Sequence, residues 1–227
     1  MKPYFSDKTC TIYHGDSYEL LPQIEADVLC TDPQYGIGFD VTRERRRAPI
    51  GLNFSSANRH LPRDPVWLPL QQQDTIKFDP SPFLGFKEII LWGAHNYAHL
   101  LPPSRGWLIW DKLRDKKPSN FGDAELAWTN KDMPLRIWRQ LWRGMVREGE
   151  ENLSRARKLH PCQKPASLMR WALQFTEGKI VLDPFMGSGT TLLAGKDLGR
   201  ITIGIELEER YCEAAARRLE QEVLAYA

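Results

Sequence analysis

The segment Lys179–Thr191, which reads KIVLDPFMGSGTT, constrains the fold of this chain more than any other stretch. A short apolar run reaches Asp183, a turn with Gly187 and Gly189 follows, and Thr190 opens a run compatible with a helix. Glycines at such a turn permit positive φ angles and let the backbone approach a ligand closely. The N–H groups at a helix start point toward an anionic group such as a carboxylate. The segment therefore predicts a strand, a ligand-binding turn and a helix, which is the repeating unit of parallel α/β sheets.

An acidic residue lies in register with this turn. The next predicted strand, Ile201–Ile205, ends in Glu206, about 20 residues after Gly187. In nucleoside-binding sheets an acid at this spacing accepts hydrogen bonds from the ribose hydroxyls. A dinucleotide cofactor would require glycine at the position of Leu192, and an ordinary strand-to-helix turn remains the structural alternative. The FxGxG form of the turn favours S-adenosylmethionine. The residues expected to contact this cofactor are Asp183, Pro184, Phe185, Gly187, Ser188, Gly189, Thr190 and Glu206.

The rest of the chain alternates short apolar runs with helical patterns, which indicates parallel strands with helices on both faces. Helical patterns follow Pro161 and Glu206. With 227 residues, no internal repeat and no strong linker, the chain is predicted to form a single domain, residues 1–227. The predicted fold class is α/β, Rossmann-like, with a seven-stranded, mostly parallel sheet. The predicted strands are Thr11–His14, Asp27–Thr31, Glu88–Trp92, Gly106–Trp110, Leu135–Trp138, Lys179–Leu182 and Ile201–Ile205.

A second candidate site lies where the predicted strand from Asp27 ends, at the tetrapeptide Asp32-Pro33-Gln34-Tyr35. Ligands in open α/β sheets bind outside the carboxyl ends of the strands, so this tetrapeptide should face the same crevice as the glycine turn. An aromatic amine on adenine or cytosine is a poor nucleophile because its lone pair is delocalised into the ring. The Asp32 carboxylate and the Pro33 carbonyl would accept hydrogen bonds from the two N–H groups of this amine, while Tyr35 stacks on the extruded base. By itself Asp-Pro after a strand more often begins a turn, but beside the glycine turn it predicts a methyl-transfer site.

Three motifs, taken in order, resemble a known family. TDPQYGIG at residues 31–38, HPCQKP at 160–165 and LDPFMGSGTT at 182–191 resemble the adenine-N6 and cytosine-N4 DNA amino-methyltransferases, and GIELEERYCEAAARRL at 204–219 extends the likeness. The tetrapeptide precedes the glycine turn, as in the circularly permuted β group of that family. The resemblance covers residues 11–35 and 160–219 well and the middle of the chain poorly. It implies transfer of a methyl group from S-adenosylmethionine to an exocyclic amino nitrogen of DNA.

The resemblance implies two further cofactor residues. Asp16 would follow the third strand of the cofactor half and lie near the adenine amino group of S-adenosylmethionine, although Gly15-Asp16 is by itself a common strand-end turn. Lys164, with Gln163, precedes the first cofactor strand and would lie near the methionine end of the cofactor. The structural alternative is that Lys164-Pro165 simply begins a helix.

Gln34 departs from the family, which usually has proline at this position. Without that ring the φ angle of residue 34 is free, and the restriction on residue 33 is lifted. The Pro33 carbonyl is then less rigidly aimed. Gln34 can itself donate or accept a hydrogen bond, so it is a candidate contact to the base or to a phosphate. A weaker enzyme, an altered base preference and a non-catalytic DNA-binding relative are all compatible with this change.

Basic residues near the predicted strand ends are candidate phosphate contacts, although most charge clusters are merely solvated surface. Residues 39–82 are an inserted basic loop region and residues 113–159 a variable segment, and both are candidate DNA-recognition elements. The candidate DNA-binding residues are Arg43, Arg45, Arg46, Arg47, Lys112, Arg114, Arg155 and Arg157.

Composition excludes several other classes. The four cysteines form no C-x-x-C pair, no third ligand accompanies His95 and His99, and we therefore expect no metal site. No apolar run reaches the length of a membrane span, so we expect a cytoplasmic protein without membrane contact. The expected partner is double-stranded DNA, and the sequence is compatible with a homodimer and with a partner restriction endonuclease.

We therefore predict a DNA methyltransferase acting on adenine N6, because cytosine-N4 relatives more often have serine at the position of Asp32. Cytosine N4 is the nearest alternative. A protein glutamine methyltransferase faces the same lone-pair problem, but its N-P-P-Y motif follows the glycine turn, whereas the tetrapeptide here precedes it.

Overall fold

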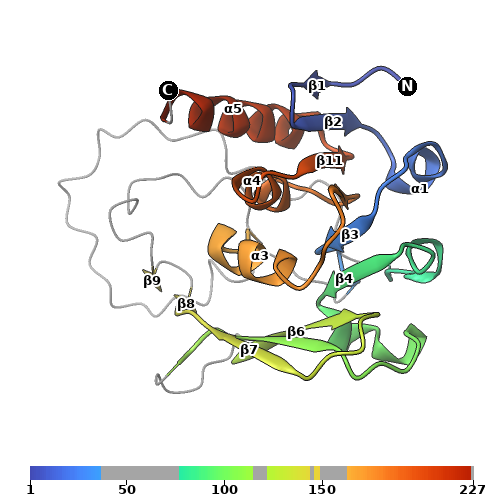
Figure 1. Cartoon of the computed structure of the whole chain (residues 1–227), viewed down its shortest axis with the longest axis vertical. Helices are drawn as coiled ribbons and strands as arrows, with labels where there is room; N and C mark the ends of the chain where they lie inside the picture. Colours follow the sequence, from blue (N-terminus) through green and yellow to red (C-terminus); the bar gives the residue numbers. More distant parts are fainter. Residues whose placement is uncertain (37–76, 115–121, 144–145, 149–162, 226–227) are drawn as a thin grey trace, which may run out of the picture.

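A computed structural model describes residues 1–36, 77–114, 122–143, 146–148 and 163–225 of the chain. These residues form an α/β domain built on one sheet, whose strands lie in the order β1-β2-β11-β10-β3-β4-β6-β5-β7 (Figure 1). The strands are β1 (Phe5–Ser6), β2 (Cys10–His14), β3 (Val28–Thr31), β4 (Glu88–Trp92), β5 (Trp107–Asp111), β6 (Ala124–Thr129), β7 (Arg136–Arg139), β10 (Ile180–Asp183) and β11 (Ile201–Glu206). A separate antiparallel pair joins β8 (Trp142–Arg143) to β9 (Val146–Arg147).

The predicted fold class is confirmed, whereas the sheet has nine strands in the described residues rather than seven. All seven predicted strands are present within one or two residues of their expected ends. The two additional strands are the short edge strand β1 and the central strand β6. Strand β6 pairs antiparallel with both β4 and β5. Its sequence AELAWT lacks a clear alternation of apolar and polar residues, so its assignment to the sheet depends on pairing with β4 and β5.

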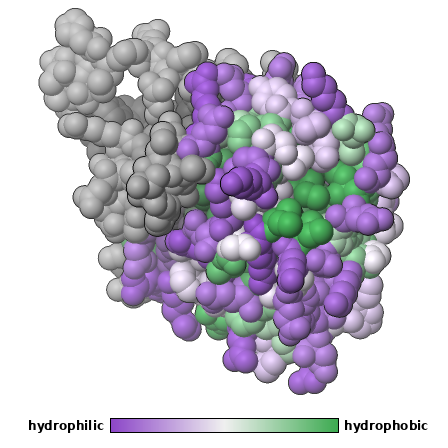
Figure 2. Space-filling view, turned by 45° about the horizontal axis from the view of Figure 1, so that its top comes forward, coloured by the Kyte–Doolittle hydropathy of each residue, from purple (hydrophilic) through white to green (hydrophobic). Residues whose placement is uncertain are grey.

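The sheet buries an apolar core on each face, because successive side chains of a strand point to opposite sides. Val28 and Cys30 of β3 pack in one cluster with α3 (Ala166–Leu173) and α4 (Thr190–Asp197). Leu29 of the same strand packs in the other cluster, with Phe83, which precedes β4, and Tyr97, which follows it. A third cluster joins β2 to α4 and to α5 (Glu209–Ala225). Figure 2 shows the described surface of one face as mostly hydrophilic with one compact apolar patch.

The N-terminal strand β2 packs against the C-terminal elements of the chain. Strand β2 pairs in parallel with β11 over five residues, and α5 packs near them at the same end of the sheet (Figure 1). Strand β10 lies between β11 and β3, so the glycine turn that follows β10 adjoins the tetrapeptide that follows β3. The remaining described helix, α1 (Ser17–Leu20), follows β2, and short 3-10 turns occupy Leu21–Gln23, Ser81–Phe83, Ala94–Asn96 and Ala98–Leu100.

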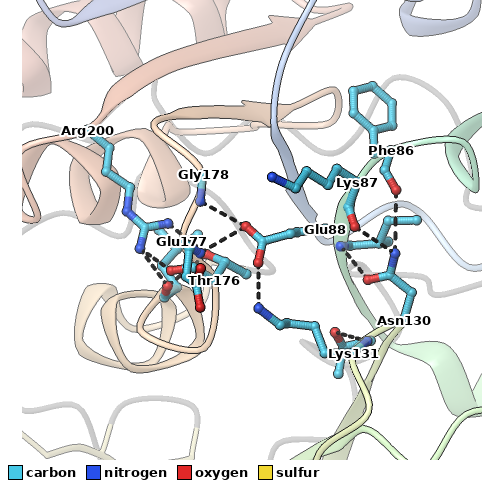
Figure 3. Close-up of polar contacts among 12 residues, drawn as sticks. Phe86, Lys87, Glu88, Asn130, Lys131, Thr176, Glu177, Gly178 and Arg200 are labelled. Carbon is cyan, nitrogen blue, oxygen red and sulfur yellow. Dashed lines mark hydrogen bonds and ion pairs between the residues drawn. The ribbon is translucent and has the colours of Figure 1, made fainter.

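Carboxylates at the opposite edge of the sheet hold the link between α3 and β10. Glu88, which is 5% exposed, accepts hydrogen bonds from the backbone N–H groups of Glu177 and Gly178, both at 2.8 Å, and pairs with the Lys131 ammonium at 2.5 Å (Figure 3). Asp27 accepts in the same way from the N–H groups of residues 179 and 180. These bonds set the start of β10, whose other end bears the glycine turn.

Candidate active site

The candidate site lies at the edge of the sheet where the parallel strands end. Thr31, the last residue of β3, is followed by Asp32; Asp183 ends β10 and Glu206 ends β11. Because these three strands are neighbours and run in the same direction, their C-terminal residues meet at one edge. The Thr31 hydroxyl donates a hydrogen bond of 2.6 Å to Asp183 Oδ1, which ties the two strand ends together. The predicted convergence of the tetrapeptide with the glycine turn is therefore present.

Asp32 is held through both of its carboxylate oxygens. The Tyr35 hydroxyl donates to Asp32 Oδ1, and the Lys164 ammonium lies 2.6 Å from Asp32 Oδ2. Pro33 is buried, whereas Gln34 is exposed. The tetrapeptide thus folds back on itself, with its aspartate and tyrosine joined and its glutamine directed toward solvent.

Lys164 binds a second carboxylate, that of Glu125 on β6. Its ammonium lies 2.8 Å from Glu125 Oε2, and its side chain is only 7% exposed. Glu125 Oε1 accepts a further hydrogen bond from the Lys112 ammonium at 3.0 Å. Four charges of alternating sign therefore run from Lys112 through Glu125 and Lys164 to Asp32. Because β6 is antiparallel to its neighbours, its first residues reach the same edge at which the parallel strands end.

The two carboxylates that share Lys164 have different proton affinities. Burial raises the pKa of Asp32, and the nearby negative charge of Glu125 adds to this, while Lys164 acts in the opposite direction. Burial also opposes ionisation of Glu125, but Lys164 and Lys112 outweigh it and lower the pKa of Glu125 to about 2. For Lys164, the two carboxylates outweigh burial and raise its pKa. Asp32 is therefore the more basic of the two carboxylates.

Tyr35 occupies a place that only glycine can leave open. Gly93, which follows β4, has a φ of 70°, and a β-carbon there would lie 2.0 Å from Tyr35 Cε1. The Tyr35 ring is 6.4 Å from the Tyr97 ring, and its hydroxyl lies 3.4 Å from the Lys164 ammonium. Gly93 thus makes room for the tyrosine ring beside Asp32.

The glycine turn adopts the predicted conformation. Gly187 and Gly189 have φ angles of 51° and 75°, a region that residues with a β-carbon rarely adopt. The Gly187 N–H donates to Glu206 Oε2 at 3.0 Å, and the Glu208 N–H donates to Glu206 Oε1 at 2.8 Å. Burial raises the pKa of Glu206 to about 7. A direct hydrogen bond therefore joins the turn to its acid, and the predicted contact of Glu206 with the ribose hydroxyls stays a prediction.

Other residues predicted at the cofactor are largely engaged within the protein. Asp183 is buried, accepts from the Phe185 N–H at 3.1 Å, and has its pKa raised by burial to about 6. Ser188 and Thr190 are also buried, and Arg218 donates to the Ser188 carbonyl at 3.3 Å and to the Thr190 hydroxyl at 3.0 Å. These three residues shape the turn, and their predicted contact with a cofactor stays a prediction.

The strand ends on the β2 side present groups that suit a nucleoside. Gly15 N–H donates to the Glu206 carbonyl at 3.0 Å, so the exposed Asp16 lies next to the acid of β11. Asp16 also caps α1, whose Ser17 hydroxyl donates to the Pro184 carbonyl. Phe185 contributes to an aromatic cluster whose other members are Tyr18, Phe78 and Phe83.

A buried acceptor next to Lys164 lacks a partner. Gln163 Oε1 has no hydrogen-bond partner among the residues that the structure describes. A buried acceptor of this kind is normally satisfied, and the ammonium group of a methionine-like ligand would satisfy it. Together with the carboxylates of Asp16 and Glu206, it makes a set of acceptors that fits the amino and hydroxyl groups of an amino-acid nucleoside such as S-adenosylmethionine.

The predicted DNA-binding residues are only partly described. Arg43, Arg45, Arg46, Arg47, Arg155 and Arg157 lie outside the described residues. Lys112 has 15% of its side chain exposed, and its ammonium is paired with Glu125, as the first of the four alternating charges that end at Asp32. Arg114 is paired with Glu148 at 2.5 Å and is half exposed. Within the segment 113–159, strands β6 and β7 belong to the sheet.

In the described part of the chain, no three His, Cys, Asp or Glu side chains gather closely enough to hold a metal ion. No helix among the described residues has the length and apolar character needed to cross a membrane.

Sequence reasoning missed Glu125 and Gly93, and it assigned Lys164 only to the cofactor. A single acid within the mostly apolar run Ala124–Thr129 was the available signal for Glu125. That signal becomes informative only when the run is known to be a strand and its direction is known, and neither could be inferred locally.

The chain is similar in sequence and in fold to known DNA methyltransferases. M.ScaI of Streptomyces caespitosus, a type II methyltransferase, is 27% identical over 264 residues, which cover 97% of this chain and 84% of the relative. The crystal structure of the M1.HpyAVI–SAM complex has a TM-score of 0.54 at 23% identity, covering 92% of this chain and 99% of that chain. The cytosine-N4-specific PvuII DNA methyltransferase has a TM-score of 0.60 at 16% identity, covering 95% of this chain and 88% of that chain. The two structural likenesses support the fold.

Residues 87–217, more than half of the chain, match the DNA methylase family N6_N4_Mtase. The chain belongs to this DNA methylase family. The matched region of the methylase begins just before β4 and includes the cofactor half. The tetrapeptide at Asp32 precedes that region. Family membership confirms the resemblance and the general activity, a DNA methyltransferase of the N6/N4 type.

Proposed function

We propose that this methylase transfers the methyl group of S-adenosylmethionine to the N6 amino group of adenine in double-stranded DNA. The observation that carries the proposal is the position of Asp32. Its carboxylate lies at the end of β3, next to the strand end that bears the glycine turn, and it is tied to Tyr35 and Lys164. A hydrogen-bond acceptor in this place can hold an amino group in line with a methyl donor.

In the proposed reaction, Asp32 acts mainly as a hydrogen-bond acceptor and not as a strong base. When bound, S-adenosylmethionine supplies an electrophilic methyl group on a positively charged sulfur. The Asp32 carboxylate and the Pro33 carbonyl accept hydrogen bonds from the two N–H groups of the amino nitrogen, and this directs the nitrogen lone pair toward that methyl group. A carboxylate has about four lone-pair sites, so Asp32 can accept from the base in addition to its two present partners. As the bond from nitrogen to the methyl group forms, the bond from sulfur to that group would break and leave a neutral thioether. The methylated nitrogen is then a strongly acidic cation that loses its proton to Asp32 or to solvent, so a strong base is not required.

The cofactor is S-adenosylmethionine, as family membership and the neighbour solved with that molecule support. Glu206 would accept the ribose hydroxyls, since each of its oxygens has only one present donor. Asp16 would lie near the adenine amino group, and Gln163 Oε1 would accept from the ammonium group. Lys164 would then contact both Asp32 and the region of the methionine end.

The choice of adenine over cytosine depends on one residue type. Asp32 favours adenine because cytosine-N4 relatives more often have serine at this position. The likeness to a cytosine-N4-specific enzyme at 16% identity bears on the fold and leaves the target base to experiment.

A direct test identifies the methylated nucleoside. Unmethylated plasmid DNA is incubated with the purified protein and methyl-labelled S-adenosylmethionine, digested to nucleosides and separated by chromatography. We expect N6-methyladenine. N4-methylcytosine would replace adenine by cytosine as the target, and label recovered in protein instead of DNA would oppose the whole proposal.

Two variants sharpen this assay. Asp32→Ala should abolish methyl transfer while cofactor binding, measured by calorimetry, stays near that of the native protein. Gln34→Pro restores the residue usual in the family and separates a weakened enzyme from a non-catalytic relative. An inactive native protein with an active Gln34→Pro variant would show that this chain is a DNA-binding relative that has lost turnover.

The similarity to type II methyltransferases supports a place in restriction and modification. A partner restriction endonuclease, a homodimer and phosphate contacts by the arginines outside the described residues remain predictions. Single-base sequencing of DNA from cells that express the protein would identify the recognition sequence.

A further inference from the structure

Glu125 is the one carboxylate of β6 that faces the catalytic tetrapeptide. We propose that Glu125 is a positioning residue for methyl transfer, which holds the Lys164 ammonium so that Asp32 stays free to accept a hydrogen bond from the target amino group. This inference rests on the proposed function, and it adds a residue from a strand that contains none of the motifs of the family resemblance.

The first argument is the balance of buried charge. Lys164 is 7% exposed, and Glu125 and Asp32 each have 21% of their side chains exposed. An ammonium in such a place needs compensation, because removing one partner of a buried pair leaves an uncompensated charge. Lys164 has two carboxylate partners at 2.6 and 2.8 Å, and Lys112 balances the second carboxylate at 3.0 Å. The chain of four charges is therefore neutral as a whole.

The second argument is how Lys164 divides its charge. A lysine ammonium paired with Asp32 alone would compete with the target amino group for the carboxylate. Because Glu125 takes part of that charge, Asp32 keeps more of its capacity as an acceptor. The opposite displacement of the two carboxyl pKa values agrees with this division, since Glu125 stays ionised with a pKa of about 2 and Asp32 is the more basic group.

The third argument is the rigidity of the frame. Glu125 lies opposite Trp110 of β5, within a strand that also pairs with β4. Lys164 directly precedes Pro165, the N-cap of α3, and its ammonium lies 5.7 Å from the centre of the buried Trp92 ring. A carboxylate on a central strand can therefore hold the lysine in one orientation, as supporting residues around a functional group do.

Two substitutions predict pH shifts of opposite sign. Glu125→Gln removes the charge that competes for Lys164, so the pKa of Asp32 falls and the acid limb of the kcat profile moves to lower pH. Lys112→Met removes a positive charge from the far end of the chain, so the pKa of Asp32 rises and the acid limb moves to higher pH. If these residues only stabilised the sheet, the two substitutions would not move the acid limb of the kcat profile in opposite directions.

The experiment measures kcat and KM for DNA across pH, the Kd for S-adenosylmethionine and thermal stability. For Glu125→Gln we expect kcat to fall by about tenfold or more, as loss of an outer partner of a functional group does, with the two binding constants nearly unchanged. Glu125→Asp keeps the charge and should recover most of kcat and the native pH profile. Unshifted pH profiles in both charge variants, or equal losses of kcat and cofactor binding, would overturn the inference.

The outcome can be separated from that of the proposed function. The native protein's transfer of label to DNA tests the function, and an active native enzyme with an unaltered Glu125→Gln variant would refute only the inference. If the native protein transfers no label, carbon-13 NMR titration of the Asp32 carboxyl in the native and variant proteins still tests the two opposite pKa shifts. This titration also serves if a variant folds too poorly for kinetics, because either of the two charge variants alone has a predicted sign.

Discussion

Replacing Lys164 by methionine removes the cation between two partly buried carboxylates while keeping most of the apolar stem. The ammonium lies 2.6 Å from Asp32 and 2.8 Å from Glu125, and the lysine side chain is 7% exposed. Removing one partner of a buried ion pair costs about 3–5 kcal/mol. Since domains of this size are stable by about 5–15 kcal/mol, the variant should fold but with a large loss.

The matched control is Arg105→Met. Arg105 and Asp132 are 3.1 Å apart, but their side chains are 77% and 78% exposed, and such exposed pairs contribute about 0.2–1 kcal/mol. Urea unfolding, followed by circular dichroism and extrapolated to water, measures both losses. A loss for Lys164→Met no larger than that of the control would refute the argument that the buried charges depend on this lysine.

The loss should also depend on pH with a definite sign. Without the cation, the pKa of Asp32 in the folded variant rises further above its unfolded value, because Lys164 no longer opposes burial and the negative charge of Glu125. A group with a raised pKa contributes stability below its unfolded pKa and loses that contribution as the pH rises through its folded pKa. The deficit of the variant should therefore be larger at pH 8 than at pH 5, and a deficit independent of pH would contradict this account.

Three further predictions concern other parts of the methylase. Gly93→Ala should lower kcat, because its β-carbon would lie 2.0 Å from the Tyr35 ring. Gly122→Ala is the control: Gly122 has a φ of 63° and, among the described residues, no atom would lie within 4 Å of its β-carbon, so this variant has a similar backbone strain of about 1–2 kcal/mol and should leave kcat unchanged. Glu88→Gln should cost about 1–3 kcal/mol in urea unfolding; the carboxyl pKa is lowered by its partners against the effect of burial, so the difference from the native protein should vanish as the pH falls through the folded pKa. Glu206→Gln should weaken binding of S-adenosylmethionine by roughly tenfold in calorimetry, and an unchanged Kd would remove this acid from the cofactor site.

Much of the cofactor half follows from local sequence. Positive φ angles at Gly187 and Gly189 and the acid at Glu206 were predictable, because glycine backbone freedom and the length of a strand–turn–helix unit are short-range properties. The same is true of the strand that ends at Asp32. That the tetrapeptide and the glycine turn would share an edge was also predictable, since parallel strands end on the same side of a sheet.

The tertiary structure alone decided what surrounds Asp32. Whether Ala124–Thr129 is a strand, and in which direction it runs, depends on its pairing between β4 and β5, which the residues of the segment itself do not determine. That direction brings Glu125 to the catalytic edge and lets Lys164 bind two carboxylates at once. The interaction between two charges depends on their separation and on their burial, so it is determined by the folded structure and not by the order of residues in the chain. The sequence by itself therefore determined the chemical groups at the site, and the packing of distant strands determined their charge states.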